Sequence, residues 1–219
     1  MPVFNLKQII SGGFSMKYKA MLVVLLFGFV PALLAQDGES ALKAFGGDMK
    51  ERAEARILFW DSAEKSAVGE FVITYGRPEW KPEYSETATF DKMTKGKVWR
   101  VGKNFWTMLD TNVPLRVGGE QVEPGQYYLG VLRSNDGAQW QLCFFDPVAA
   151  REDLLDASEI DQAEIAFTAP LMFSKSETVK EKLEISLEKS ENRLNRSQLK
   201  IQWGSFELKT VVFARLNGE

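Results

Sequence analysis

The sequence predicts an all-β protein, either an antiparallel β-sandwich or an open barrel, with one or two short helices. Between Gly96 and Asp146, short apolar and aromatic runs alternate with turn signals, which is the pattern of a β-meander. In the C-terminal third, apolar and polar residues alternate over 183–188 and again over 199–203, as in strands with one solvated face. About ten short strands joined by tight turns fit a sandwich or barrel.

The N-terminal half of the predicted domain contains two strands and one helix. Residues 53–60 and 70–75 are apolar-rich and are separated by a polar turn. Pro78 ends the second strand, because proline cannot donate to a sheet ladder. Residues 87–93 form a helix-like patch in the long connection that follows.

Three glycine-containing pairs or triplets predict turns in the meander. Gly118-Gly119 suits a two-residue hairpin, because glycine adopts positive φ without steric cost. Pro124-Gly125 has the composition of a type II turn, and Asn135-Asp136-Gly137 predicts another hairpin. Together these turns leave little room for a helix before Asp146.

After the meander, Pro147 is placed to begin a helix. The helix is expected over 148–157, with Leu154 and Leu155 as its buried residues. Strands are then expected over 163–168, in the two alternating segments and over 206–213, where apolar and polar residues alternate again. Gly204-Ser205 is expected to be the hairpin between the strands over 199–203 and 206–213.

The N-terminus has the features of a secretory signal peptide. Ala20 to Ala35 is an uncharged run of sixteen residues preceded by Lys17 and Lys19, and this basic–apolar–small order predicts Sec-type export to the periplasm or the extracellular space. The run is shorter than the roughly 20 residues that span a bilayer. Leu33, however, lies three residues before the expected cleavage site, where a small residue is preferred, so an uncleaved anchor remains the alternative. Met16 is an alternative to Met1 as the start of the chain.

The expected organisation is a signal peptide over 1–35, a lead-in over 36–52 and a single domain over 53–216. Removing residues 1–35 takes away three lysines and no acidic residue, which changes the net charge from −3 to −6. Non-specific binding to nucleic acid or anionic lipid is not expected of an acidic exported chain. If the signal peptide is cleaved, the mature chain is not expected to insert stably into a membrane.

The chain contains no histidine. This excludes Ser-His-Asp and Cys-His catalysis and zinc sites built on imidazole. The single cysteine, Cys143, lies within an apolar run, where a buried structural thiol is expected rather than a nucleophile. No cofactor, metal site or catalytic residue is assigned from the sequence, and the oligomeric state is left open.

Five residues are candidates for a ligand-binding cleft. They combine cationic, amide and indole groups near the start of the meander: Arg77, Trp80, Arg100, Asn104 and Trp106. Indoles stack on sugar rings but also fill cores, and core positions are expected for Trp99, Trp140 and Trp203. For the two arginines the alternative is a salt bridge that fixes a loop, because partly buried arginine is usually paired.

Five short motifs occur in order along the predicted domain: Tyr75-Gly76-Arg77-Pro78, Gly96 to Gly102, Gly118-Gly119, Pro124 to Tyr127 and Ile201 to Gly204. Together they resemble the DUF2911 family of β-rich exported proteins of unknown function. The resemblance covers roughly 53–216 and implies export and a β-rich fold but no activity. The chain departs from the commoner family pattern at Trp80 to Tyr84 and at Phe105-Trp106, so its ligand could differ.

Two functions follow from these observations. The first is a non-catalytic binding module of the cell envelope or extracellular space, with a small molecule or a glycan as its ligand. The alternative is a hydrolase that uses two carboxylates, as a glycosidase does, with Asp110 and Glu120 as nominal candidates. The lack of histidine and of catalytic motifs favours the binding module.

Overall fold

Strands dominate the part of the chain that this computed structural model describes, which is residues 42–44 and 51–216. Residues 42–44 have no regular secondary structure and belong to a unit over Met1–Phe45, whereas 51–216 belong to a second unit, Gly46–Glu219. The expected signal peptide and most of the lead-in lie outside the described residues. No helix within the described residues is long and apolar enough to cross a membrane.

The second unit contains strands and short helices in an order close to the predicted one. The strands are β1 (Arg52–Asp61), β2 (Ser66–Gly76), β3 (Val98–Arg100), β4 (Thr107–Thr111), β5 (Leu115–Val117), β6 (Glu120–Val122), β7 (Gly125–Arg133), β8 (Trp140–Phe145), β9 (Phe167–Lys189) and β10 (Arg196–Ala214). The helices are α1 (Thr87–Thr94) and α2 (Pro147–Glu152), with 3₁₀ turns η1 (Pro82–Ser85) and η2 (Ala157–Glu159).

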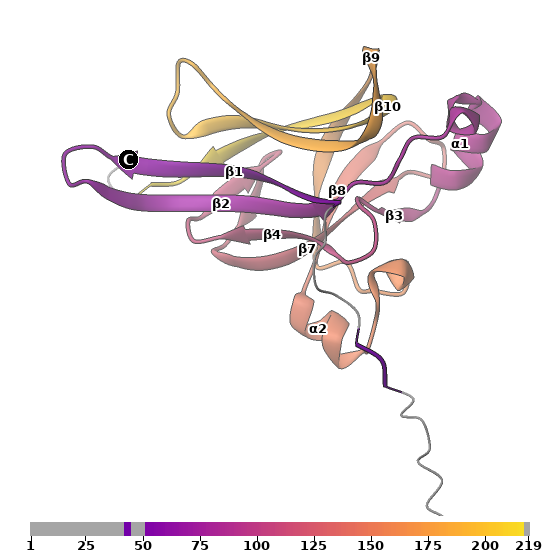
Figure 1. Cartoon of the computed structure of the whole chain (residues 1–219), viewed down its shortest axis with the longest axis horizontal. Coiled ribbons are helices and arrows are strands. Elements are labelled where there is room, and N and C mark those ends of the chain that lie inside the picture. Colours follow the sequence, from indigo (N-terminus) through magenta and orange to yellow (C-terminus); the bar gives the residue numbers. More distant parts are fainter. Residues whose placement is uncertain (1–41, 45–50, 217–219) are drawn as a thin grey trace, which may run out of the picture. The chain divides into compact units, whose positions relative to one another are not determined.

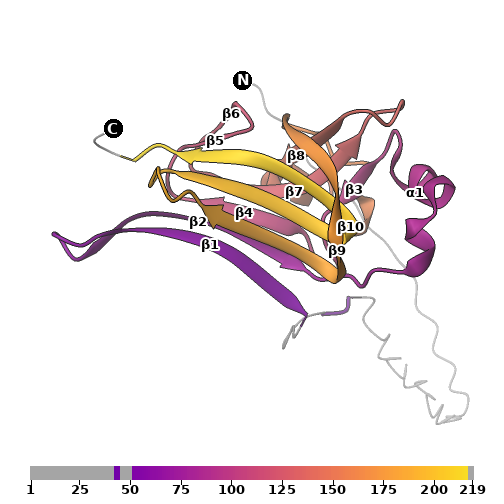
Figure 2. The same cartoon turned by 90° about the horizontal axis from the view of Figure 1, so that it is seen from above.

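Within the described residues, the ten strands form one antiparallel open sheet. The order is β1-β2-β4-β7-β8-β9-β10-β5-β6, and β3 pairs with β7 beside this path. The first residues of β9 pair with β8, and from Met172 onward β9 pairs with β10. The sheet therefore folds back on itself along this long strand, and β9 and β10 lie above β1, β2, β4 and β7 (Figures 1 and 2).

The end of β2 and the segment after it connect these two layers at one side through hydrogen bonds. The Tyr75 hydroxyl donates to the Ile185 carbonyl oxygen at 3.1 Å, and the Leu183 amide donates to the Pro78 carbonyl oxygen at 2.9 Å. Burial raises the pKa of Tyr75, which keeps the phenol protonated as a donor. These bonds fix the chain from 75 to 78 against β9, next to the candidate site.

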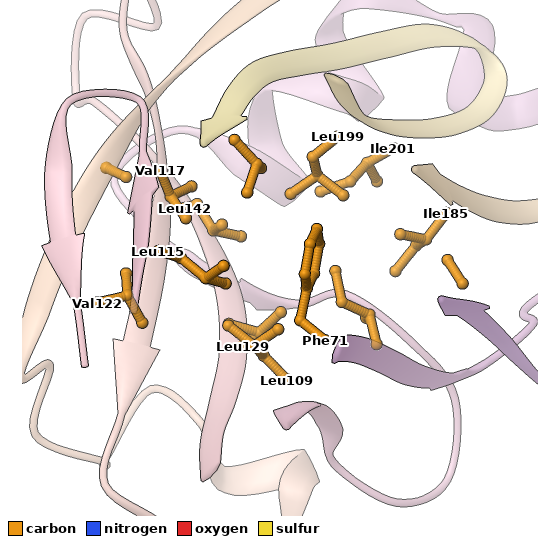
Figure 3. Close-up of a cluster of buried hydrophobic side chains, with 14 of the residues drawn as sticks. Phe71, Leu109, Leu115, Val117, Val122, Leu129, Leu142, Ile185, Leu199 and Ile201 are labelled. Atoms are coloured by element: carbon orange, nitrogen blue, oxygen red, sulfur yellow. The ribbon is translucent and has the colours of Figure 1, made fainter. Parts of the chain in front are cut away.

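The space between the layers is filled by apolar side chains. Phe71, Leu109 and Leu129 point upward from one layer, and Leu199 and Ile201 point down from β10 (Figure 3). All five are at most 4% exposed, and the free volume among the core side chains is only about 10 Å³. The interior is a packed core rather than a ligand chamber, so a ligand site has to lie elsewhere.

The outer face of the lower layer is covered by α2 and the turn after it. The Asp146 carboxylate accepts the Val148 amide at 2.7 Å and caps α2, whose first residue is Pro147. The helix is shorter than predicted, because Leu154 adopts a φ of +58° that no helix can continue. Leu154 is consequently 88% exposed, contrary to prediction, whereas Leu155 packs against the apolar cluster beneath the helix.

The turn predictions in the meander are confirmed at two of three positions. Gly118 and Gly119 have φ of +59° and +103° and close the β5–β6 hairpin, and Asn135 to Gly137 closes β7–β8. The type II turn at Pro124-Gly125 is wrong. Gly125, with φ +151°, already begins β7, and the pair connects strands that are not neighbours in the sheet.

The hairpin predicted at Gly204-Ser205 is also wrong, because β10 continues through it. Gly204 has φ +61° and lies at a register shift between β9 and β10, so it makes a bulge instead of a turn. The strand predicted over 163–168 begins only at Phe167.

Candidate functional site

Eight aromatic side chains meet near α1, within the described residues, where the segment after β2 crosses β9 and β10. They are Trp80, Tyr84, Phe90, Trp99, Trp140, Phe173, Trp203 and Phe206. Between them lies a depression lined by Phe90, Met93, Thr94, Trp99, Trp140, Phe173, Ile201, Trp203, Phe206 and Leu208. We call this depression the aromatic groove.

Trp203 anchors one side of the aromatic groove. Its indole Nε1 donates to the Pro78 carbonyl oxygen at 3.1 Å, which satisfies the one polar atom of the ring. The ring stacks on Trp99 with centroids 5.2 Å apart and an interplanar angle of 19°, and it meets Trp80 edge to face at 5.2 Å. These contacts hold the segment around Trp80 on the sheet.

Gly204 allows Trp80 to approach β10. A Cβ atom at this position would overlap the Trp80 indole ring, and the positive φ of Gly204 is costly for other residues. The bulge and the close approach therefore depend on the same glycine. The Trp80 amide also donates to the Glu181 carbonyl oxygen at 2.7 Å, so both backbone and ring are fixed.

Helix α1 forms the opposite wall. Phe90 stacks on Phe206 at 3.9 Å and 12°. The Arg133 guanidinium lies 5.4 Å from the Phe90 ring centroid and donates to the Asp91 carboxylate at 2.6 Å. A hydrogen bond from Lys95, and to a smaller extent one from Arg133, lowers the pKa of Asp91 below its usual value. This carboxylate is therefore ionised and paired near neutral pH.

The chemistry of the aromatic groove is almost wholly apolar. Apart from indole N–H groups, Thr94 has the one polar side chain among the described lining residues. Its hydroxyl is already engaged, donating to the Phe90 carbonyl oxygen at 2.7 Å and accepting from Arg133 at 3.0 Å. Phe173 remains 40% exposed at the rim, and the free volume inside is about 40 Å³. The aromatic side chains of the groove can pack against the apolar edge of a ligand, but the groove offers few hydrogen-bonding groups.

The structure does not bring the five predicted site residues into one cleft. Only Trp80 lies at the aromatic groove, where it packs against the lining residues Trp203 and Phe206 without lining the depression itself. The Arg77 Nε donates to the Leu183 carbonyl oxygen at 3.2 Å, and Arg100 donates to the Asn104 carbonyl oxygen at 3.3 Å. Among the described residues, neither arginine makes the salt bridge considered as the alternative. Both donate hydrogen bonds to backbone carbonyl oxygens instead. Asn104 is exposed, with φ +67°.

Trp106, predicted to lie in an open cleft, is 4% exposed. Its ring stacks on Tyr128 at 4.5 Å and 5° in the cluster under α2, together with Cys143, Phe145, Ala150, Ala157 and Ile160. Within the described structure, its Nε1 and the Nη1 of Arg52 are buried without a hydrogen-bond partner. We call this group the closed cluster, because α2 and η2 cover it.

Some of the groove residues were not selected by sequence reasoning. Phe90, Phe173 and Phe206 lie 33 or more residues apart in the sequence, and the antiparallel pairing of β9 with β10 brings the last two together. Trp99 and Trp203, expected in the core, are only partly buried and pack against it from the groove side. The one feature of the sequence that could have indicated an aromatic site is its content of six tryptophans.

The nucleophile and acid–base candidates have structural surroundings. Burial raises the pKa of Cys143 to about 12, so the thiol stays protonated. Asp110 accepts from Gln126 at 2.9 Å on the β4–β7 pair, whereas Glu120 begins β6 and is exposed. No group of three or more His, Cys, Asp or Glu residues in the described ranges could hold a metal ion.

Comparison with known proteins gives one family. A model described as "Protein of unknown function (DUF2911)" matches residues 61–212, from the end of β1 into the last strand. No curated protein and no solved structure matches the chain. The match covers most of the chain and agrees with the Arg77-Pro78 and Ile201 to Gly204 motifs, so the chain belongs to the DUF2911 family.

Proposed function

We propose that this chain is a non-catalytic binding module that acts in the periplasm or the extracellular space. Its ligand places an apolar ring or hydrocarbon edge in the aromatic groove. One observation carries this proposal: α2 and η2 cover the closed cluster and side chains fill the space between the two layers, whereas the aromatic groove reaches the surface at Phe173. The groove is a depression with an almost wholly apolar lining, and concave sites of this composition are where small ligands usually bind.

A hydrocarbon suits the groove better than a glycan does. Sugar binding combines ring stacking with hydrogen bonds to several hydroxyls, but the Thr94 hydroxyl is engaged and the Trp203 N–H is bonded to Pro78. A sugar entering the groove would lose hydrogen bonds to water without replacing them, which costs about 1–3 kcal/mol for each buried unpaired group. A hydrocarbon has no such cost.

The size of the groove limits how a ligand enters. Its free volume of about 40 Å³ is well below the roughly 300–1,000 Å³ of sites for drug-sized molecules. The groove therefore takes a terminal ring edge or chain end. Displacement of α1 would admit more, since Thr94 is the one fully buried residue of that helix.

The hydrolase alternative has no comparable support. Asp110 and Glu120 lie on different strands, and neither lines the aromatic groove. A glycosidase needs two carboxyl groups that face each other across a cleft.

The ligand proposal is tested with N-phenyl-1-naphthylamine, a neutral probe that fluoresces in apolar surroundings. We expect saturable binding to the chain and at least a tenfold rise in Kd for Phe173→Ser. Phe105→Ser is the matched control, because Phe105 is a phenylalanine of similar exposure, 37% against 40%, outside the groove. Unchanged binding by Phe173→Ser, or equal losses in both variants, would contradict the proposal.

The same titration separates a sugar ligand from a hydrocarbon. Chitohexaose is expected not to compete with the naphthylamine. Competition that disappears in Phe173→Ser would retain the aromatic groove as the site but replace the hydrocarbon ligand by a glycan. Export is tested separately by N-terminal sequencing of the protein from its host, which should begin at Gln36; a chain beginning at Met1 or Met16 would contradict cleavage.

A further inference from the structure

A second cavity lies at the other end of the domain, away from α1. It has a volume of about 390 Å³ and is formed by the β5–β6 hairpin, the end of β10 and the residues before β10. Its polar and aromatic lining includes Arg116, Gln121, Glu123, Arg193, Phe213 and Arg215. We call this cavity the arginine pocket. Figure 2 shows the β5–β6 hairpin and the last part of β10 on the side of the domain away from α1.

The sheet register places three of these side chains in one row. Arg116 on β5 lies opposite Gln121 on β6 and opposite Phe213 on β10. Directly opposed residues point to the same face of a sheet. Leu115 and Val117 face the core and are at most 4% exposed, so Arg116 points outward into the cavity. Guanidinium, amide and phenyl groups therefore form one wall.

Backbone hydrogen bonds position the remaining arginines. The Arg215 amide donates to the Pro114 carbonyl oxygen at 2.8 Å, and the Ala214 amide donates to the Asn195 carbonyl oxygen at 2.8 Å. These bonds hold the ends of β5 and β10 and the turn containing Arg193 together. In addition, the Arg196 guanidinium lies 5.9 Å from the Phe213 ring centroid.

The charge of the pocket is unbalanced. Glu123 is its one acidic lining residue, against three arginines. No described residue forms a salt bridge with Arg116, Arg193 or Arg215, whereas Arg56, Lys180 and Lys200 elsewhere on the surface are each paired with a glutamate. Arginines that gather around a cavity without an ion-pair partner among the described residues, in a chain of net charge −3, favour a bound anion.

We propose that the arginine pocket binds a small organic anion through a carboxylate or phosphate group. Guanidinium groups bind both oxyanions in the same two-point geometry. The pocket volume lies within the roughly 300–1,000 Å³ of small-molecule sites. Phe213 adds an apolar face for a ring attached to the anion. This site is independent of the aromatic groove and of the ligand proposed for it.

The test is isothermal titration calorimetry with inorganic phosphate, phenyl phosphate and benzoate at low salt. We expect phenyl phosphate or benzoate to bind with saturation, and Arg116→Gln/Arg215→Gln to weaken that binding at least tenfold. Lys65→Gln/Arg151→Gln removes the same charge outside the pocket and is expected to change Kd less than twofold. Phe213→Leu should remove the advantage of phenyl phosphate over inorganic phosphate.

Three results would overturn the proposal. They are no binding of any of the three probes, equal binding by the parent and the Arg116→Gln/Arg215→Gln variant, and equal losses in that variant and the control. Thermal unfolding of each variant establishes that the binding domain is folded during titration. The naphthylamine titration is expected to be unchanged in Arg116→Gln/Arg215→Gln, which separates this pocket from the aromatic groove.

Discussion

The closed cluster and the aromatic groove lie on opposite faces of the same strands, and they contain the same kinds of side chains. On β8, Trp140 belongs to the groove, while Cys143 and Phe145 belong to the closed cluster. The clusters differ in what covers them. Helix α2 begins with a capped Asp146-Pro147 pair and seals its cluster, whereas α1 leaves Phe173 40% exposed. Coverage, rather than aromatic content, distinguishes a structural cluster from a candidate site.

The largest effect is expected at the closed cluster. Trp106→Ala removes a stacked, 4% exposed ring, and truncations of this kind cost about 3–5 kcal/mol. The free energy of unfolding is measured by urea denaturation. Trp60→Ala is the control, because Trp60 is 56% exposed, and its change should stay within about 0.5 kcal/mol. Equal losses in the two variants would mean that Trp106 is not enclosed.

A smaller effect is expected where Trp80 meets β10. Gly204→Ala adds a Cβ that overlaps the Trp80 ring and places alanine at φ +61°, so we expect a loss of about 1–3 kcal/mol in urea unfolding. Gly119→Ala has positive φ as well, but no heavy atom lies within 4 Å of its added Cβ. Its loss should be smaller. If both variants lose the same stability, the close approach of Trp80 contributes nothing.

The strands and the fold class were easier to predict from the sequence than the turns. Alternation at positions such as Leu199 and Ile201 depends only on neighbouring residues, so the strands, the Gly118-Gly119 hairpin and the all-β class were predictable. Gly204 was predicted to be a hairpin because a bulge and a turn both favour glycine. Only the pairing of β10 with β9 on both sides of Gly204 distinguishes them.

The site was less predictable than the fold. Trp80 was identified from its place in a loop, but Trp106 was expected to be open because Asn104 is polar and close in sequence. The covering of Trp106 comes from Ala150 and Ile160, more than 40 residues later. The arginine pocket was missed for the same reason, since the pairing of β5 with β10 and backbone hydrogen bonds at Pro114 and Asn195 bring Arg116, Arg193 and Arg215 together.

The smallest expected effect concerns the wall formed by α1. The lowered pKa of Asp91 means that its ion pairs stabilise the fold above the carboxyl's ordinary pKa of about 3.9 and are lost as pH falls below it. Asp91→Asn should therefore lower the Tm at pH 7, and the difference from the parent should shrink toward pH 3. A difference that is constant with pH would contradict this role.

The comparison between the two clusters is tested most directly by the indole N–H signals of the six tryptophans in a ¹H–¹⁵N correlation spectrum, recorded while N-phenyl-1-naphthylamine is added. The signals are assigned with single Trp→Phe variants. We expect shifts at Trp99, Trp140 and Trp203, which line the aromatic groove, and at Trp80, which packs against Trp203. Trp60 and Trp106 should not move. A shift at Trp106 as large as that at Trp203, or no shift at any groove tryptophan, would contradict the assignment of the aromatic groove as the ligand site.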